Sequence, residues 1–179
     1  MAITLENPTT VSARELAREI EAQVAQITVS TTRFGVIEVD EDLIITLPEG
    51  IIGFDQCKRF VIIQHDDVSM FRWLQSLDIA AIAFPIIDPN EFRDDYAPIV
   101  SDSDVRSLSL TAEMNPLLFA IVTIPAGNPR GMTANLLGPI VVNPITRNGK
   151  QIIVPDQGFT TRHVILEEME KLPPRIGKR

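Results

Sequence analysis

The two histidines are the first candidates for chemistry, because a neutral imidazole can act as a general base or bind a metal. His65 and His163 lie far apart in the sequence, and neither has a cysteine or a second histidine at metal-ligand spacing. Asp66 and Asp67 directly follow His65. However, the side chains of consecutive residues rarely converge on one point in a strand or a helix. We therefore interpret HDD as a polar turn rather than a catalytic or metal site.

The single cysteine, Cys57, is followed by Lys58 and Arg59. Neighbouring cations can lower the pKa of a thiol, so a reactive cysteine is one interpretation of this segment. The favoured interpretation is an ordinary half-buried thiol. One cysteine forms no internal disulfide, so the fold does not depend on an oxidising compartment.

A cluster of carboxylates lies in DPNEFRDDYAP (88–98), where Asp88, Glu91, Asp94 and Asp95 stand close together. Four carboxylates can bind a hard cation, but their spacing fits no EF-hand loop, which also needs a central glycine. The prolines and the asparagine favour a solvated loop. The sequence also lacks the glycine-rich phosphate-binding motifs and the nucleophile-elbow motif. We therefore predict no catalytic, cofactor or metal site, and no enzymatic activity.

Large apolar side chains instead stand in turn-like contexts. In LPEGIIGF (47–54) a proline and two glycines interrupt an apolar run, and NLLGPIVVN (135–143) has a Gly-Pro pair between two apolar runs. MFRWLQS (70–76) carries the only tryptophan. Such side chains are typical of protein interfaces and equally typical of a core. The candidate partner-binding residues are Ile51, Met70, Phe71, Trp73, Asn135, Leu136 and Asn143. Within the first motif we predict that Phe54 faces inward and Ile51 outward.

Composition restricts the class of protein. The chain has 179 residues, is 45% hydrophobic and carries a net charge of −8, which suits one domain and disfavours direct binding of nucleic acid or of an anionic membrane. The N-terminus has neither a basic start nor a long apolar run. The longest apolar run, 79–87, is shorter than the roughly 20 residues that span a bilayer. These features predict a soluble cytoplasmic protein.

The first thirty residues differ in pattern from the rest, and we expect a helical extension over 1–30. Ser12 and Glu15 form a capping box, in which each side chain satisfies a backbone donor at the helix start. Four apolar residues then recur at helical spacing: Leu16, Ile20, Val24 and Ile27. The helix packs on its own domain, or it is a detachable arm for a partner or a second copy. The second interpretation allows a weak homo-oligomer, and the first a monomer.

Residues 31–168 read as short strands separated by Gly, Pro, Asp and Asn. Strand candidates are 33–39, 43–47, 59–64, 79–88, 107–110, 117–125, 132–143, 151–154 and 163–166, while 68–77 fits either a helical turn or a strand. Asn148-Gly149 favours a type I′ turn that links 140–145 to 151–154. Without interleaved helices, this predicts an all-β fold, a mostly antiparallel barrel or sandwich. A short helical end is stopped by Pro173 and Pro174, and 169–179 forms a basic tail.

Several of these segments, in this order, also carry a family resemblance. LPEGIIGFD (47–55), FRWLQSLD (71–78), AFPIIDP (83–89), VTIP (122–125), MTANLLGPIVVN (132–143) and GKQII (149–153) resemble the flagellar assembly factor FliW family. The resemblance covers residues 33–166. Each motif alone is weak, and it is their common register that indicates the family.

The resemblance implies a β-barrel-like fold without enzymatic activity, and two protein partners. One is flagellin, bound through its terminal region before export; the other is the translational regulator CsrA, which otherwise represses flagellin mRNA. Export of flagellin then frees the family member to bind CsrA. An acidic surface is compatible with antagonism of a basic RNA-binding protein. Residues 1–30 and the tail after 170 depart from the family pattern, as do Leu47 and Asp55, where the family often has Phe and Glu.

The rival hypothesis is a small β-barrel enzyme or ligand-binding protein that uses its lumen. Trp73 or the carboxylates of 88–95 would be the polar groups that bind its ligand or substrate. This hypothesis predicts a chromophore or metal that co-purifies with the protein.

Overall fold

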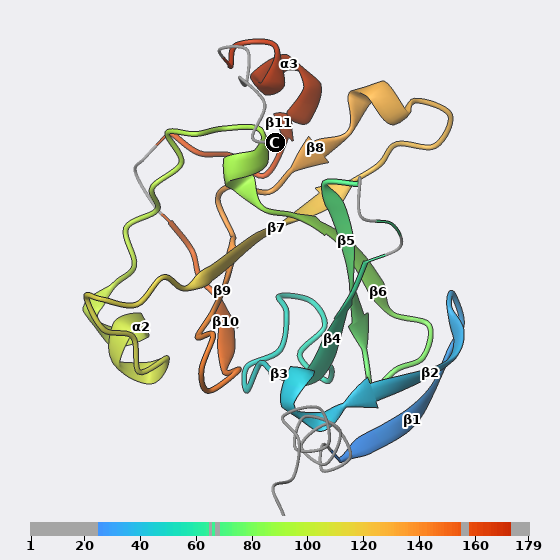
Figure 1. Cartoon of the computed structure of the whole chain (residues 1–179). Helices are drawn as coiled ribbons and strands as arrows, with labels where there is room; N and C mark the ends of the chain where they lie inside the picture. Colours follow the sequence, from blue (N-terminus) through green and yellow to red (C-terminus); the bar gives the residue numbers. More distant parts are fainter. Residues whose placement is uncertain (1–24, 65, 67–68, 155–157, 173–179) are drawn as a thin grey trace, which may run out of the picture.

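The computed structural model describes residues 25–64, 66, 69–154 and 158–172, and consists mostly of antiparallel β-structure (Figure 1). The first sheet is a two-stranded ribbon of β1 (Gln26–Thr31) and β2 (Gly35–Asp40). Ile27 pairs with Val39 and Val29 with Ile37, so one side of the ribbon is apolar. Gln26 and Asp40 form a hydrogen-bonded pair on the other side. This alternation is typical of a sheet with one face on the protein and one in water.

The predicted helical extension is wrong at its C-terminal end. Most of the predicted helix lies outside the described residues, but its last apolar position, Ile27, belongs to β1. The run Ile27–Thr31 is rich in β-branched residues, which lose side-chain freedom in a helix and suit a pleated strand. Pairing with β2 along its whole length therefore prevails over the helical spacing.

The main sheet contains nine strands, seven of them in the order β10-β9-β7-β6-β5-β4-β3, with β8 on β7 and β11 on β8. The strands are β3 (Ile45–Thr46), β4 (Arg59–Ile63), β5 (Phe71–Ser76), β6 (Ala83–Ile87), β7 (Leu117–Thr123), β8 (Thr133–Ala134), β9 (Ile140–Val142), β10 (Gly149–Gln151) and β11 (His163–Val164). All the ladders between these strands are antiparallel. The all-β, mostly antiparallel prediction is therefore confirmed.

The described strands do not close into a barrel, so the barrel part of the prediction is wrong. The end strands β3 and β10 approach each other at one isolated parallel bridge, between Thr46 and Asn148. The amide of Thr46 donates to the carbonyl of Arg147 at 3.0 Å, and no ladder extends from this bridge among the described residues. β3 has only two residues, which is too short to continue the pairing.

Short helices and turns connect the strands: η1 (Glu41–Leu43), η2 (Pro89–Glu91), α2 (Asp102–Ser107), η3 (Pro129–Gly131) and α3 (Ile165–Met169). The strand predicted at 107–110 is wrong, because Ser101 caps α2 and the helix runs to Ser107. The ambiguous segment 68–77 contains β5. Residues 165–166, predicted as strand, begin α3, and 79–82 precede β6 as a turn. Pro173 and Pro174 lie outside the described residues.

The hairpin between β9 and β10 is confirmed, although its turn is not the one predicted. Gly149 already pairs with Val142 in the ladder, and the left-handed residue of the loop is Arg147, with φ 59°. A Cβ at Gly149 would lie 2.9 Å from Cγ2 of Val142. This glycine therefore allows a close approach of two strands rather than a tight turn.

Three clusters of buried side chains form the interior. The largest includes Leu47, Phe60, Leu74 and Ile86, between the main sheet and the segment that joins β3 to β4. A second cluster lies under α3, where Ile165 contacts the region of Phe92 and Tyr96. In Figure 1 the ribbon β1–β2 and α3 lie at opposite ends of the molecule. No helix within the described residues is long and apolar enough to cross a membrane.

Candidate functional site

The segment between β3 and β4, residues 47–58, forms one wall of the candidate site. It is folded by successive turns, in which Gly50 N donates to Leu47 O at 2.9 Å and Phe54 N to Ile51 O at 2.7 Å. Gly50 and Gly53 have φ values of 75° and 85°, in the left-handed region that favours glycine. These positions account for the glycines within an apolar run.

The turns direct neighbouring isoleucines to opposite sides. Ile51 is 2% exposed and belongs to the largest buried cluster, whereas Ile52 is 64% exposed. The prediction that Ile51 faces outward is therefore wrong. Phe54 packs against the same cluster, as predicted, with its ring edge-on to Phe84 at a centroid separation of 5.0 Å.

Beside this wall lies an open groove of about 440 Å³. Its other walls come from β6, β7, the segment between β8 and β9, and the chain after β10. The apolar side chains that line it include Ile52, Phe54, Phe84, Ile121, Leu137 and Ile153. Ile153 is 55% exposed. The groove therefore presents apolar surface to solvent, which is typical of a protein or ligand contact site.

Two amides in the groove bind backbone groups of its own walls. Nε2 of Gln151 donates to Gly138 O and its Oε1 accepts from Ile52 N, both at 2.9 Å. Oδ1 of Asn135 accepts from Gly138 N at 2.9 Å. Gln151 thus joins the 47–54 wall to the 135–139 wall. Because these amide groups are occupied, they fix the shape of the groove.

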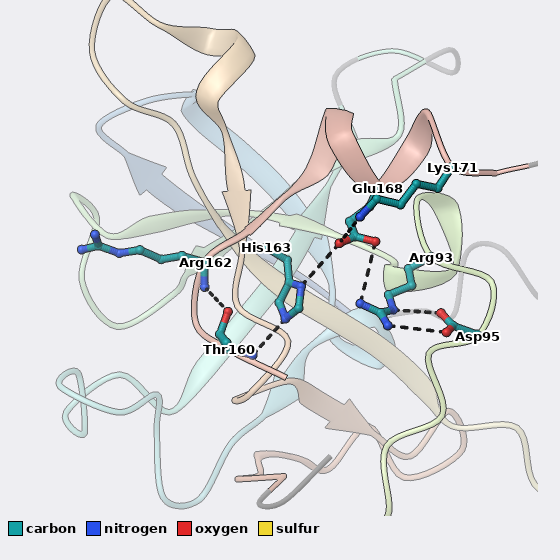
Figure 2. A network of polar contacts seen from close by, with 7 residues as sticks. All are labelled: Arg93, Asp95, Thr160, Arg162, His163, Glu168 and Lys171. Carbon is teal, nitrogen blue, oxygen red and sulfur yellow. Dashed lines mark hydrogen bonds and ion pairs between the residues drawn. The ribbon is translucent and has the colours of Figure 1, made fainter. Parts of the chain in front are cut away.

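Arg162 is the charged residue of this lining. It is exposed, and its backbone amide donates to the hydroxyl of Thr160 at 3.3 Å. Figure 2 shows its side chain extending away from the polar cluster around Glu168. No ion pair of its guanidinium is found within the described part of the chain.

Of the seven predicted partner-binding residues, two line this groove: Ile51 and Asn135. Ile51 has almost no exposed surface. Leu136 is 0% exposed and lies in the cluster under α3. Its carbonyl accepts a 2.7 Å hydrogen bond from the hydroxyl of Tyr96, and burial raises the pKa of that phenol. Leu136 and Ile51 therefore expose almost no surface to a partner.

Asn143 is also buried, and its side chain is fully used within the fold. Nδ2 donates to the carbonyls of Leu108 and Ser109, and Oδ1 accepts from the amides of Ile145 and Thr146. These bonds connect the β9–β10 loop to the end of α2. Asn143 is a structural residue in this fold, since a buried amide needs such partners.

The three predicted residues of β5 and its approach lie away from the groove. Met70 and Phe71 are half-buried and pack against the cluster under α3. Trp73 is half-buried and contacts the turn between β1 and β2, edge-on to Phe34, with the guanidinium carbon of Arg33 at 4.1 Å from its ring centroid. This arrangement attaches the ribbon to the main sheet.

A second hollow, of about 370 Å³, lies beside α3 and is lined largely by charged residues. Glu168 is at its centre, 3.2 Å from Nζ of Lys171 and 3.8 Å from both Arg93 and His163 (Figure 2). Arg93 also pairs with Asp95 at 2.8 Å. We refer to these five residues as the Glu168 cluster.

His163 is neutral in this cluster. Its Nε2 accepts a hydrogen bond from the amide of Thr160 at 2.9 Å, which requires an unprotonated nitrogen there. Burial, and the nearby charge of Arg93, lower the pKa of His163, although Glu168 acts in the opposite direction. His163 thereby anchors the 158–162 segment that carries Arg162.

The other candidates for chemistry have structural partners. Cys57 is fully buried rather than half-buried, and Asp88 caps η2 by accepting from Asn90 N at 2.9 Å. His65 and Asp67 lie outside the described residues. In the part of the chain that the structure describes, no three His, Cys, Asp or Glu side chains are grouped so that they could hold a metal ion.

Sequence reasoning missed Ile52, Gln151, Ile153 and Arg162, which complete the groove. Ile52 lies in the 47–55 motif and Gln151 and Ile153 in the 149–153 motif, although none of them was singled out there, and Arg162 belongs to no motif. Ile52 and Ile153 could have been suspected, since each is next to an apolar residue and one of two adjacent side chains in an extended segment faces outward. Arg162 and Gln151 carry no such signal.

Comparison with known proteins identifies the family. The model of the family described as FliW protein matches residues 28–165. The flagellar assembly factor FliW of Leptospira biflexa is 40% identical over 146 residues, which cover 82% of this chain and 95% of that protein. The protein of the same name from Magnetococcus marinus is 46% identical over 125 residues, which cover 70% of this chain and 77% of that protein.

A solved structure agrees. The crystal structure of a flagellar assembly factor FliW superposes with a TM-score of 0.71 at 33% identity, covering 78% of this chain and 96% of that chain. The sequence-based resemblance is thus confirmed by the family model, by the relatives and by the fold. This chain belongs to the FliW family of flagellar assembly factors.

Proposed function

We propose that this chain is a non-enzymatic cytoplasmic protein that binds flagellin and a CsrA-type translational regulator in exchange for each other. When flagellin is exported, the chain is free to bind the regulator, and repression of flagellin synthesis is relieved. The observation that carries this proposal is family membership over residues 28–165, since the family is one of flagellar assembly factors.

The structure supports a binding role through the groove. Its apolar side chains Ile52 and Ile153 are more than half exposed, and its amides are already bound to its own walls. A preformed apolar surface loses little conformational freedom when a partner covers it. The net charge of −8 supports the second partner, because an acidic protein attracts a basic RNA-binding protein.

The lumen-based alternative is not proposed. It requires a closed barrel, and the described sheet does not close. Trp73, one of its suggested polar groups, packs against Phe34 and Arg33 of the turn between β1 and β2.

The test is a pull-down of the tagged full chain with the flagellin and the CsrA-type protein of its host. We expect each partner to be retained at micromolar concentration, and each to reduce retention of the other. Retention of neither protein would overturn the proposed function.

The role of the groove is tested in the same assay with Ile52→Asp and Ile153→Asp. Each change removes an exposed apolar contact and should weaken at least one partner about tenfold or more. Ile145→Asp is the matched control, because Ile145 is 78% exposed and lies outside the groove. If the groove variants bind both partners as the control does, the partners use another surface.

A further inference from the structure

The groove combines apolar walls with one cationic side chain that has no counter-ion among the described residues. The amides of Asn135 and Gln151 face the walls. Arg162 differs, because it belongs to the lining of the groove and its guanidinium has no ion pair within the described ranges. By contrast, Lys150 on β10 is held by Glu49 at 2.8 Å and Asp104 at 3.0 Å. The guanidinium of Arg162 is therefore available to a bound partner.

We propose that the groove binds an apolar protein segment that carries an aspartate or glutamate side chain. The apolar side chains of the segment lie between the two walls that carry Ile52 and Ile153. The carboxylate of the segment pairs with the guanidinium of Arg162. This inference rests on the proposed function in that the groove is a protein docking surface. It adds the chemistry of the segment that docks there.

Charge complementarity favours this occupant over a basic one. Guanidinium and carboxylate form paired, charge-assisted hydrogen bonds, whereas a lysine or arginine at the same point would be repelled. The chain as a whole is acidic and attracts basic proteins. The charge of the groove is positive at Arg162, so it is opposite to the net charge of the molecule. The groove therefore favours an acidic segment over a basic one.

The position of Arg162 is held by the fold. Its neighbour His163 accepts a hydrogen bond from Thr160 N, and the carbonyl of Thr160 accepts from the amides of Leu136 and Leu137 at 3.1 and 3.2 Å. The segment that carries Arg162 is thus attached to the wall that carries Leu137. A fixed backbone beneath a long cationic side chain is a suitable arrangement for capturing a carboxylate at the rim of an apolar groove.

The experiment is a selection of random peptides displayed on phage against the immobilised full chain. The wild-type chain should enrich peptides that combine apolar residues with Asp or Glu. Arg162→Glu should lose the acidic enrichment and select Lys or Arg instead, while Arg130→Glu, a change of an exposed arginine outside the groove, should select as the wild type does. Ile153→Asp should abolish the enrichment.

A selected peptide is then titrated against purified variants whose thermal melts match that of the wild type. Arg162→Gln should weaken binding roughly ten- to a hundredfold, and Arg162→Lys should weaken it less, because the charge is kept. Wild-type affinity should fall as salt is raised, and this dependence should be reduced in Arg162→Gln.

The proposal is overturned if the wild-type chain enriches no peptide, or if Arg162→Glu enriches the same acidic peptides as the wild type. These results are distinct from failure of the proposed function. If flagellin and the regulator bind but the peptides do not respond to Arg162, only the inference fails. If neither protein binds, the pull-down overturns the function whatever the peptides show.

Discussion

The two hollows of this molecule have similar sizes, about 440 and 370 Å³, yet their polar groups behave differently. In the hollow beside α3, four charged side chains form ion pairs with one another: Arg93 with Asp95 and Glu168, and Glu168 with Lys171. In the groove, the amides bind the walls, and Ile52, Ile153 and Arg162 are exposed to solvent. Most charged side chains of the first hollow therefore already have partners in the fold, while the groove leaves apolar surface and the charge of Arg162 for a partner.

The comparison teaches that the size of a hollow does not identify a binding site. Charges that already have partners in the fold must lose them before they can bind anything else. Exposed apolar side chains on a preformed wall have no such penalty, and covering them is favourable at about 25 cal/mol per Å². We therefore expect changes in the groove to affect binding, and changes to the ion pairs of Glu168 with Arg93 and Lys171 to affect stability.

The largest effect is expected where the groove wall meets the core. Ile51→Asp should lower the free energy of unfolding by about 4 kcal/mol or more, because it removes a buried side chain and buries an unpaired charge. Ile52→Asp, one residue away and 64% exposed, should change stability by less than about 1 kcal/mol and instead weaken a partner. Thermal melts followed by circular dichroism measure both. Equal melting of the two variants would contradict the opposite orientations of this pair.

The next effect concerns the two glycines of the same wall. Gly50→Ala should destabilise the protein by about 3 kcal/mol, since φ is 75° and the new Cβ would lie 2.8 Å from Cα of Asp55. Gly53→Ala also has a positive φ but meets nothing within 4 Å, so its effect should be about 1–2 kcal/mol. Urea unfolding of both variants tests the difference. A larger loss at Gly53 would show that the close contact at Gly50 is relieved by movement of the wall.

A smaller effect is expected in the Glu168 cluster. Glu168→Gln weakens the pairs with Arg93 and Lys171 and should destabilise the protein by about 1 kcal/mol. Glu170→Gln, an exposed position in the same segment, is the control and should be neutral. Partner binding measured by titration should be unchanged in both variants. Loss of binding in Glu168→Gln alone would show that the charged hollow is also a docking surface.

The smallest effect concerns pH. The pKa of His163 is lower in the folded protein than its usual value of 6.5, so the unfolded chain binds the additional proton more readily. The contribution of neutral His163 is complete above pH 6.5 and is lost as pH falls through the folded pKa. His163→Gln keeps an acceptor for Thr160 N without titrating. Stability measured between neutral and mildly acidic pH should fall less in this variant, and an equal fall would place the titration elsewhere.

The β-rich fold and the turns that separate its strands could be predicted from the sequence because their signals are local. The strands at 59–63 and 117–123 stand out by β-branched and aromatic residues, and the hairpin between β9 and β10 by its apolar runs around a turn. Local signals failed where long-range pairing prevails. Ile27 fits a helical stripe, yet β2 pairs with it as a strand.

The candidate site could be predicted only in part. The segments 47–54 and 135–143 were identified because glycine and proline within apolar runs are unusual, and both do contribute walls. The hydrogen bonds of Asn143 to Leu108 and Ser109 could not be predicted from its segment, because they join residues far apart in the chain. Gln151 and Arg162 have no local signal, because their roles depend on which walls lie opposite them.

The sequence by itself determined the family, the β-rich class and the two segments that form much of the groove. Only the tertiary structure decided which side chains those segments expose. In both segments the more accessible residue follows the one that was predicted: Ile52, which is 64% exposed, follows Ile51, and Leu137, which is half-buried, follows Leu136. In extended chain, successive side chains point to opposite sides, so a shift of one residue exchanges core for surface. That shift is set by the turn at Gly50 and by the bonds of Leu136 and Leu137 to Thr160.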